Sequence, residues 1–303
     1  MIRLRKWRRI IVRIVLKIYR ILVSAVYMLI YTLPKISSKK LPKIGFSYNV
    51  FDGDELLKYS INSIKPYAEY ISVIYSTKSN FGNQETWGLK DNLLKLQSKG
   101  YIDELIEYIP KVSGNSCDGL NNEIEKRNIG LQKSIDNKCD VHVSIDCDEM
   151  YNQKEIEYAI WRFMLSGAES MVLQHKQFYK NTKTEVVPSE NTYVTLFELL
   201  NKNIENYQLN AKGPVLDPTR KLGGRRRYIY FQRFEIEMMH LSFIRKNLKV
   251  KLVNSSANIP LESQDKICDY YENYKANTDA LWADLSYRKT KSVNIPNLPY
   301  IEF

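Results

Sequence analysis

Cysteine and histidine are scarce in this chain of 303 residues, which has four cysteines and three histidines. No two cysteines form a Cys-x-x-Cys pair, and no histidine stands at a zinc-ligand spacing from any of them. Neither a disulfide framework nor a structural zinc site is therefore indicated. We expect reduced thiols in a cytosolic protein. Internal repeats and low-complexity tracts are also absent, which argues against a repeat architecture.

Acidic residues are missing from the first 40 residues, which hold eleven Lys and Arg. Residues 41–303 hold 34 basic and 34 acidic residues and are formally neutral. The net charge of +11 therefore belongs to the N-terminal arm. A nucleic-acid-binding domain usually spreads a basic face over its folded part. We therefore predict no nucleic-acid partner.

A charge-free hydrophobic run long enough to cross a bilayer is also missing. The uncharged run at 21–33 has 13 residues, whereas a spanning helix needs about 20. Extending it back to Ile10 includes Arg13, Lys17 and Arg20, whose spacings of four and three place them on one side of a helix. We predict an amphipathic membrane helix, within an arm covering residues 1–40, that lies in the interface and meets anionic lipid headgroups.

Three other interpretations of the arm stay open: a short or tilted span, a cleaved signal peptide, and a helix packed on its own domain. No clear small-x-small cleavage site follows the apolar run, which argues against the signal peptide. Because positive charge stays on the inner side of a membrane, the basic end predicts a location on the cytoplasmic face of the cell membrane.

Beyond the arm, strand and helix patterns alternate along the chain. Apolar runs predict strands at 43–50, 70–75, 141–145 and 171–175, and capped periodic segments predict helices at 54–64, 86–98, 118–137 and 154–165. Residues 102–108 are ambiguous. This order predicts an α/β fold with a Rossmann-like, mostly parallel sheet flanked by helices, in a domain covering residues 41–260. An appendage at 261–303 follows, with a helix at 263–284 and an extended tail at 294–303.

Two carboxylates, Asp146 and Asp148, come where the predicted strand at 141–145 ends. Residues i and i+2 of a strand point the same way, so both side chains can face a cleft beyond its carboxyl end, where such sheets bind ligands. Hard oxygen ligands suit Mg2+ or Mn2+, and such an ion keeps positions for substrate phosphates. The pattern indicates a cation with a nucleotide diphosphate, although a bare Asp-x-Asp can also be a surface turn.

Several segments, in order, resemble one known family. They are a strand-helix-strand unit (46–57 and 71–75), the loop after it (79–83), a basic-Asn-x-Gly element (126–130), the Asp-x-Asp, and a late histidine segment (240–246). Over roughly 44–257 the chain thus resembles GT-A-fold glycosyltransferases of the broad family-2-like group, which use nucleotide-activated sugars. Cys147 stands between the two aspartates, where we expect it to expose a thiol near the site.

The resemblance implies a cofactor and a set of site residues. Asp148 would coordinate Mn2+ or Mg2+, Asp146 would contact the ion's shell or the ribose, and His240 would supply a neutral ring nitrogen. The nucleotide sugar would lie against Asn49, Phe51, Asp52, Asn80, Arg127, Asp146 and Arg220.

Alternatives to these roles stay open. His240 can be a packed core residue, as we expect for His142 and His175, and Arg127 can form a structural ion pair. Asp52 can cap a helix. The stretch 217–227, which is rich in Gly and Arg, is either a mobile loop that folds over a diphosphate or anionic acceptor or a solvated charge run.

Transfer with inversion needs a base near the acceptor, usually Asp or Glu. The candidates are Glu237, Glu235 and Asp217, and we expect Glu237 because it lies three residues before His240. A retaining enzyme would not need this base. The predicted function is a metal-dependent, hexosyltransferase-like glycosyltransferase that moves a sugar from a nucleotide diphosphate donor to a lipid-linked or cell-surface glycan. Alternatives are a nucleotidyltransferase of similar fold and a non-catalytic membrane-bound sugar-binding protein.

Overall fold

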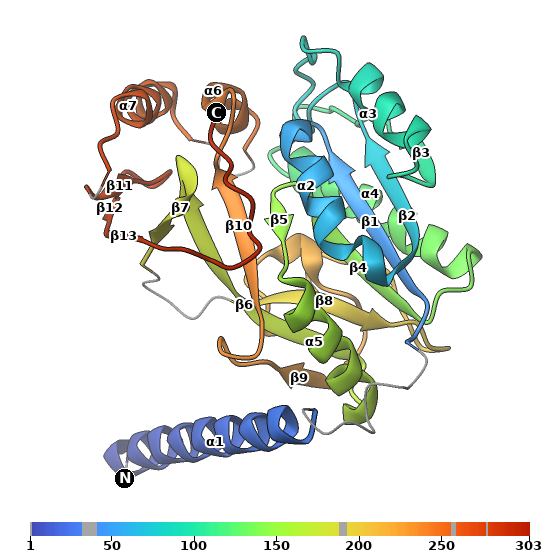
Figure 1. Ribbon diagram of the computed structural model, residues 1–303, viewed down its shortest axis with the longest axis vertical. Helices are drawn as coiled ribbons and strands as arrows, with labels where there is room; N and C mark the ends of the chain where they lie inside the picture. The colour runs from blue at the N-terminus through green and yellow to red at the C-terminus, as the bar shows by residue number, and fades with distance from the viewer. Residues whose placement is uncertain (1, 32–40, 188–192, 256–258, 277) are drawn as a thin grey trace.

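The computed structural model describes residues 2–31, 41–187, 193–255, 259–276 and 278–303. A long N-terminal helix, α1 (Ile2–Tyr31), lies along the base of the molecule, and strands and helices alternate from β1 to β4 (Figure 1). The predicted α/β class is confirmed, and the arrangement is consistent with the GT-A fold that the resemblance implies.

The first half of the sheet is parallel and has the strand order β3-β2-β1-β4. Its central strands β1, β2 and β4 are buried apolar runs because helices cover the sheet. The elements of this half match the predicted order: β1 (Ile44–Val50), α2 (Asp54–Ile64), η1 (Lys65–Tyr67), β2 (Ala68–Tyr75), α3 (Leu89–Ser98), β3 (Glu104–Glu107), α4 (Asp118–Asp136) and β4 (Val141–Asp146). The ambiguous stretch at 102–108 contains a strand.

Helix α3 begins three residues later than the sequence predicts. The side chain of Glu85 accepts hydrogen bonds from the backbone N–H groups of Trp87 and Gly88, and Gly88 has a left-handed φ of 74°. The carboxylate therefore holds these residues in a turn, and the first helical residue is Leu89.

Beyond β4 the sheet is mixed. β8 runs antiparallel to both β4 and β6, and β7 runs antiparallel to β6, whereas β9 and β10 pair with β6 in parallel. β5 pairs only briefly with β10. The elements are β5 (Glu149–Met150), α5 (Gln153–Ser166), β6 (Ser170–Tyr179), β7 (Asn181–Val186), β8 (Tyr193–Leu199), η2 (Pro218–Arg220), β9 (Tyr228–Tyr230) and β10 (Glu237–Phe243).

The C-terminal segment differs from its prediction. After α6 (Leu248–Val253), helix α7 (Leu261–Glu272) ends well before residue 284, and the short strands β11 (Ala280–Leu281), β12 (Tyr287–Arg288) and β13 (Thr290–Ser292) follow. Trp282 stacks on Phe243 of β10 with 4.2 Å between ring centroids. The stretch predicted as one long helix is therefore divided between a helix and a hairpin, and its aromatic residues form a core with the sheet. The division at residues 40 and 260 stays a prediction.

Helix α4 lies directly on β1, and Gly130 permits this close approach. A Cβ atom at Gly130 would lie 1.7 Å from Oγ and 2.5 Å from Cβ of Ser47. Real Cβ atoms do not approach other heavy atoms this closely, so any larger residue would push the helix away from the strand. The position of α4 matters because this helix also carries polar residues to the end of β4.

We predict that Gly130→Ala lowers the free energy of unfolding by about 2 kcal/mol, because overpacking outweighs the better helix propensity of alanine. Ser47→Gly in the same chain removes both clashing atoms and should restore most of the loss. Gln132→Ala, at an exposed position of α4, is the matched control. Urea unfolding measures all four proteins, and an unchanged midpoint for Gly130→Ala would contradict the packing.

Candidate functional site

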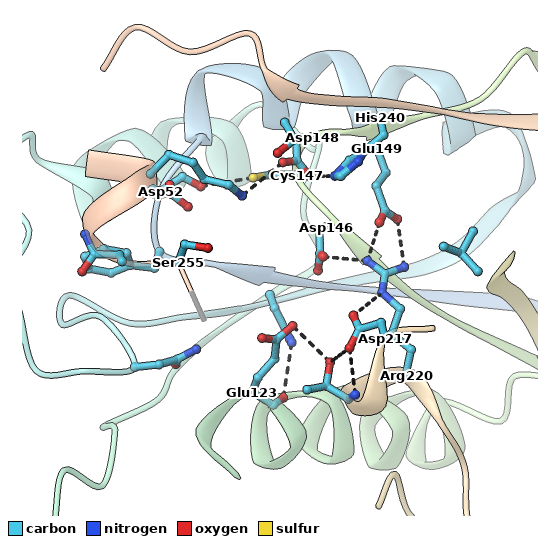
Figure 2. A pocket seen from close by; sticks show the side chains of 18 of the residues that line it. Asp52, Glu123, Asp146, Cys147, Asp148, Glu149, Asp217, Arg220, His240 and Ser255 are labelled. Carbon is cyan, nitrogen blue, oxygen red and sulfur yellow. Dashed lines mark hydrogen bonds and ion pairs between the residues drawn. The ribbon is translucent and has the colours of Figure 1, made fainter. Parts of the chain in front are cut away.

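A cleft of about 520 Å³ opens where β1 and β4 end (Figure 2). The sheet register places Asn49 of β1 beside Asp146 of β4, so the polar residues that follow both strands meet at one edge. The opposite wall comes from β10, from η2 and from α6. Nine residues predicted for the site line this cleft: Asn49, Phe51, Asp52, Asn80, Asp146, Asp148, Asp217, Arg220 and His240.

The turn between β4 and β5 carries the two aspartates. β4 ends at Asp146, and Asp148 lies in the turn before β5. β5 pairs with β10 so that Glu149 stands opposite His240, and the backbone N–H of Leu241 donates to the carbonyl oxygen of Asp148 at 2.8 Å. This pairing brings His240 to the turn across a long separation in sequence.

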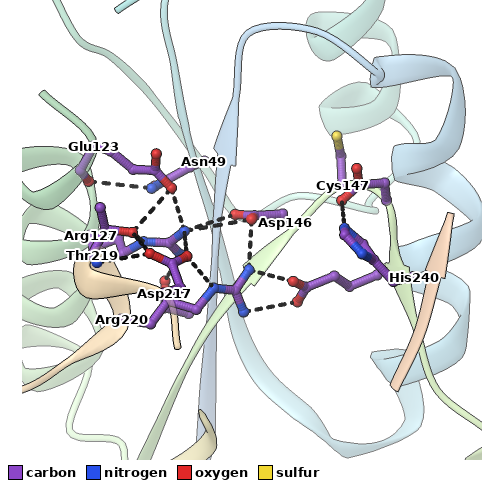
Figure 3. A network of polar contacts seen from close by, with 12 residues as sticks. Asn49, Glu123, Arg127, Asp146, Cys147, Asp217, Thr219, Arg220 and His240 are labelled. Atoms are coloured by element: carbon purple, nitrogen blue, oxygen red, sulfur yellow. Dashed lines mark hydrogen bonds and ion pairs between the residues drawn. The ribbon is translucent and has the colours of Figure 1, made fainter. Parts of the chain in front are cut away.

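Asp146 is held by two arginines. Its Oδ2 accepts a hydrogen bond from Arg220 at 2.6 Å, and its Oδ1 accepts one from Arg127 at 3.3 Å (Figure 3). Burial alone would raise the pKa of this carboxyl group, but Arg220 and Arg127 lower the pKa to about 2. Asp146 is therefore ionised and paired at neutral pH. Its assignment to the shell of a metal ion stays a prediction.

Arg220 connects the aspartate turn to η2. Its guanidinium group also pairs with Glu149, and its Nε lies 3.4 Å from Oδ2 of Asp217. Asp217 caps η2 by accepting from the backbone N–H of Thr219 at 2.8 Å, and this turn directs Arg220 inward, where 4% of it is exposed. Burial raises the pKa of Glu149 to about 7, although Arg220 opposes the shift. The charges of η2 thus form a buried network in this structure.

Asp148 has a second set of cationic partners. Its Oδ2 accepts a hydrogen bond from Arg245 and lies 3.5 Å from Nζ of Lys251, whereas its Oδ1 lies 3.7 Å from Nε2 of His240. Burial alone would raise the pKa of Asp148, but Lys251, Arg245 and His240 hold this pKa well below its usual range. Burial also lowers the pKa of His240, so its ring is neutral at pH 7 and offers a lone pair.

Asp148 and His240 fit a divalent cation with two protein ligands. Two donors that each lie about 2.1 Å from one ion are roughly 3 to 4 Å apart, and the 3.7 Å between Oδ1 and Nε2 falls in this range. A carboxylate oxygen with an imidazole suits Mn2+. Within the described parts of the chain, no group of three or more His, Cys, Asp or Glu could hold an ion. Oxygens of a bound substrate would complete the coordination.

Several polar groups at the cleft have no partner among the residues that the structure describes. The Oδ1 atoms of Asn49 and Asn80 are buried and accept no hydrogen bond there. Lys126 is 4% exposed and makes no hydrogen bond or ion pair in the same set, and burial lowers the pKa of its ammonium group. Arg245 leaves its Nε and Nη1 without acceptors. Burying such groups is costly, so a ligand toward which these side chains turn would be favoured.

Arg127 lies behind the cleft wall, whereas its neighbour Lys126 lines it. The Arg127 side chain is fully buried and donates to Glu123, Ser144 and Asp146. The structural ion pair that the sequence left open is therefore present. Lys126 was not predicted, although its place next to Arg127, about 100° around the same helix, could have suggested it.

Three further cleft residues were missed in the sequence. Arg245 belongs to the late histidine segment and could have been chosen from it, and Glu149 follows the Asp-x-Asp directly. Lys251 carries no comparable signal, because only the folding of α6 against the cleft brings its ammonium group to Asp148.

The two glutamates proposed as bases do not line the cleft. Met238, His240 and Ser242 face it, and side chains alternate along a strand, so Glu237 is on the other face of β10. There Glu237 pairs with Lys176 at 2.9 Å. The separation of three residues from His240 was therefore misleading, because an odd step in a strand reverses the face. Glu235 is buried and pairs with Arg162, which leaves Asp217 as the base candidate inside the cleft.

The expectation that Cys147 exposes a thiol is wrong. The residue is 4% exposed, and its thiol donates to the carbonyl oxygen of Asp52 at 3.1 Å. Burial raises the pKa of the Cys147 thiol well above its usual range. This cysteine therefore closes the wall between β1 and β4 and is not a reactive group.

We predict that iodoacetamide at pH 8 modifies the exposed Cys117 first and leaves Cys147 unmodified in the folded chain, because the thiolate is the reactive form. Peptide mass spectrometry measures the modification at each cysteine. The variant Cys117→Ser should lose the fast reaction, and labelling in urea shows that Cys147 can react once the chain unfolds. Fast labelling of Cys147 under native conditions would contradict the observed burial.

No protein-family model matches the sequence, and no curated protein matches it. Similar solved structures include S. aureus TarS 1–349, with 10% sequence identity and a TM-score of 0.39, covering 76% of this chain and 71% of that chain. GalNAc-T7 with UDP, GalNAc and Mn2+ has 12% identity and a TM-score of 0.41, covering 76% of this chain and 50% of that chain.

The mannosyltransferase PcManGT from Pyrobaculum calidifontis, in complex with GDP-Man and Mn2+, has 11% identity and a TM-score of 0.30, covering 52% of this chain and 42% of that chain. At these identities and TM-scores, the similarities do not establish an activity for this chain.

Proposed function

We propose that this chain is a metal-dependent glycosyltransferase that moves a sugar from a nucleotide diphosphate donor to a glycan acceptor. The observation that carries the proposal is the combination, in one cleft, of the Asp148 and His240 pair with several basic side chains and side-chain amides. A nucleotide sugar has oxygens for the cation, phosphate charge for the basic side chains, and a base with both donors and acceptors.

The end of the cleft near β1 suits the nucleoside. The Oδ1 atoms of Asn49 and Asn80, once these side chains turn toward the cleft, can accept from N–H groups of a base, and the Lys126 ammonium group can donate to a carbonyl oxygen. Phe51 lines the same end, and Trp87 holds its ring edge-on with 5.4 Å between centroids. An aromatic face at this point can stack on the base.

The end near β10 suits the diphosphate. Arg245 has two nitrogens, Nε and Nη1, without acceptors among the described residues, and Lys251 lies beside it at Asp148. Charge-assisted bonds from these side chains would hold phosphate oxygens against the Asp148 and His240 pair. A divalent cation bound there would supply Lewis-acid stabilisation of the charge that develops on the leaving diphosphate.

Asp217 is our candidate for the base, should the transfer invert the sugar. It lines the cleft, and its side chain is 36% exposed, so an acceptor hydroxyl can approach it. Arg220 and Thr219 fix its orientation through its two carboxylate oxygens. A transfer with retention would leave Asp217 with a positioning role only.

The acceptor that we propose is a lipid-linked or cell-surface glycan at the cytoplasmic face of the membrane. Two features support this part of the proposal. The first is the basic arm at residues 1–40. The second is the apolar stretch Ile14–Tyr31 of α1, which is long and apolar enough to cross a membrane and of which only 6% is buried in the structure.

The proposal is tested by incubating the full chain with UDP- and GDP-sugars, Mn2+ and a glycan acceptor, and measuring release of nucleoside diphosphate. We predict that EDTA, Asp148→Asn and His240→Ala each lower the rate roughly 100-fold or more, because each removes stabilisation of the leaving group. Asp91→Asn, the same change at an exposed site on α3, should have no effect. Release of pyrophosphate would instead identify a nucleotidyltransferase, and binding without turnover would indicate a non-catalytic protein.

A further inference from the structure

One face of α1 packs against the folded domain. Arg20, Ser24, Tyr27 and Tyr31 follow each other at spacings of four, three and four, which places them on a single face of a helix. The ring of Tyr27 lies 6.1 Å from that of Trp161, and the ring of Tyr31 lies 5.2 Å from it. Ser24 is fully buried in this contact.

Two arginines complete this contact, which we call the aromatic dock. Arg20 of α1 lies over the ring of Tyr230 in β9 at 4.0 Å, and Arg162 of α5 lies over the ring of Tyr27 at 5.3 Å. Cation–π contacts of this kind contribute roughly 0.5 to 2 kcal/mol each. Because these contacts join α1 to both α5 and β9, they hold α1 along the base of the domain (Figure 1).

The opposite face of α1 is apolar and exposed. Ile18, Leu22 and Val26 are exposed by 53%, 61% and 55%, and they repeat every four residues. Leu22 lies two residues from Ser24, which is about 200° around a helix. The dock and the apolar face therefore point in nearly opposite directions, so the apolar face is directed away from the domain.

A helix docked in this way cannot cross a bilayer without taking part of the domain with it. The dock extends from Arg20 to Tyr31, about 16 Å along the helix, and a hydrocarbon core is about 30 Å thick. A crossing helix would carry α5 and β9 into that core. The exposed Arg225 and Arg227, which precede β9 directly, would enter it too, and charged side chains are costly there.

We propose that α1 lies in the plane of an anionic lipid leaflet, with its Ile18–Leu22–Val26 face in the acyl boundary and with the aromatic dock holding the catalytic domain above it. Charge complementarity identifies the partner, because the first 40 residues carry eleven bases and no acid, and Lys17, Arg225 and Arg227 are exposed. This inference rests on the proposed membrane association and does not depend on sugar transfer. It adds which face of α1 enters the lipid and how the folded domain is held against the helix.

The orientation of α1 determines how far the acceptor sugar lies from the membrane surface. β1 runs away from α1 (Figure 1), and the cleft lies at the carboxyl end of β1. The cleft and α1 are therefore at opposite ends of this strand. A strand of seven residues is roughly 23 Å long. The acceptor sugar must therefore stand off the membrane by a comparable distance, as the end of an extended lipid-linked glycan would.

The test is the topology of the full chain, produced in Escherichia coli with one epitope tag at each end. Protease is added to inverted membrane vesicles, in which the cytoplasmic face is outside. An in-plane helix leaves both tags on that face, so we expect both to be digested at similar rates. Protection of the N-terminal tag alone, until detergent is added, would show that α1 spans the membrane and would overturn the inference.

A second measurement uses sedimentation with vesicles of phosphatidylcholine and phosphatidylglycerol. The variant with Leu22→Glu and Val26→Glu should bind at least about tenfold more weakly than the unaltered chain. Leu94→Glu, at an exposed apolar position of α3, should bind normally. If the unaltered chain fails to bind, membrane association and this inference fall together, whereas the release of nucleoside diphosphate tests sugar transfer separately.

Discussion

The ion pairs at the turn between β4 and β5 hold the candidate site together. Arg220 joins this turn to η2 through Asp146 and Glu149, and Arg245 joins it to the end of β10 through Asp148. Removing one partner of a buried pair typically costs about 3 to 5 kcal/mol, because it leaves a charge uncompensated. Three segments far apart in the sequence are therefore fixed around one pair of aspartates, and the walls of the cleft depend on that arrangement.

Some polar groups of the cleft have hydrogen-bond partners within the protein, and others have none among the described residues. Both oxygens of Asp146 accept from guanidinium groups, whereas Asp148 presents one oxygen to a neutral His240. The Lys126 ammonium group, and Nε and Nη1 of Arg245, donate to no acceptor among the described residues. This asymmetry favours a ligand that is anionic at its centre and carries both donors and acceptors at one end, which is the chemistry of a nucleoside diphosphate.

The local parts of this fold could be predicted from the sequence, because they depend on neighbouring residues. Helix α2 has the predicted bounds Asp54–Ile64, and the Asp-x-Asp lies at the end of a strand, as predicted. The mixed half could not be predicted, since its strands are ordered by contacts between distant segments. Glu237 shows the same limit within the site. Its separation of three residues from His240 is plain in the sequence, but the face on which its side chain lies depends on secondary structure that the sequence left undecided. Lys251 reaches Asp148 only through the position of α6.

We expect the cleft to bind a nucleotide through its phosphates as well as its base. Calorimetric titration of the full chain with UDP or GDP in the presence of Mn2+, beside uridine or guanosine, tests this most directly. We predict one saturable site for a diphosphate. The matching nucleoside should bind more weakly by at least about 100-fold, since the charge-assisted bonds are lost. Equal affinity for nucleoside and diphosphate, or no binding of either nucleotide, would contradict it.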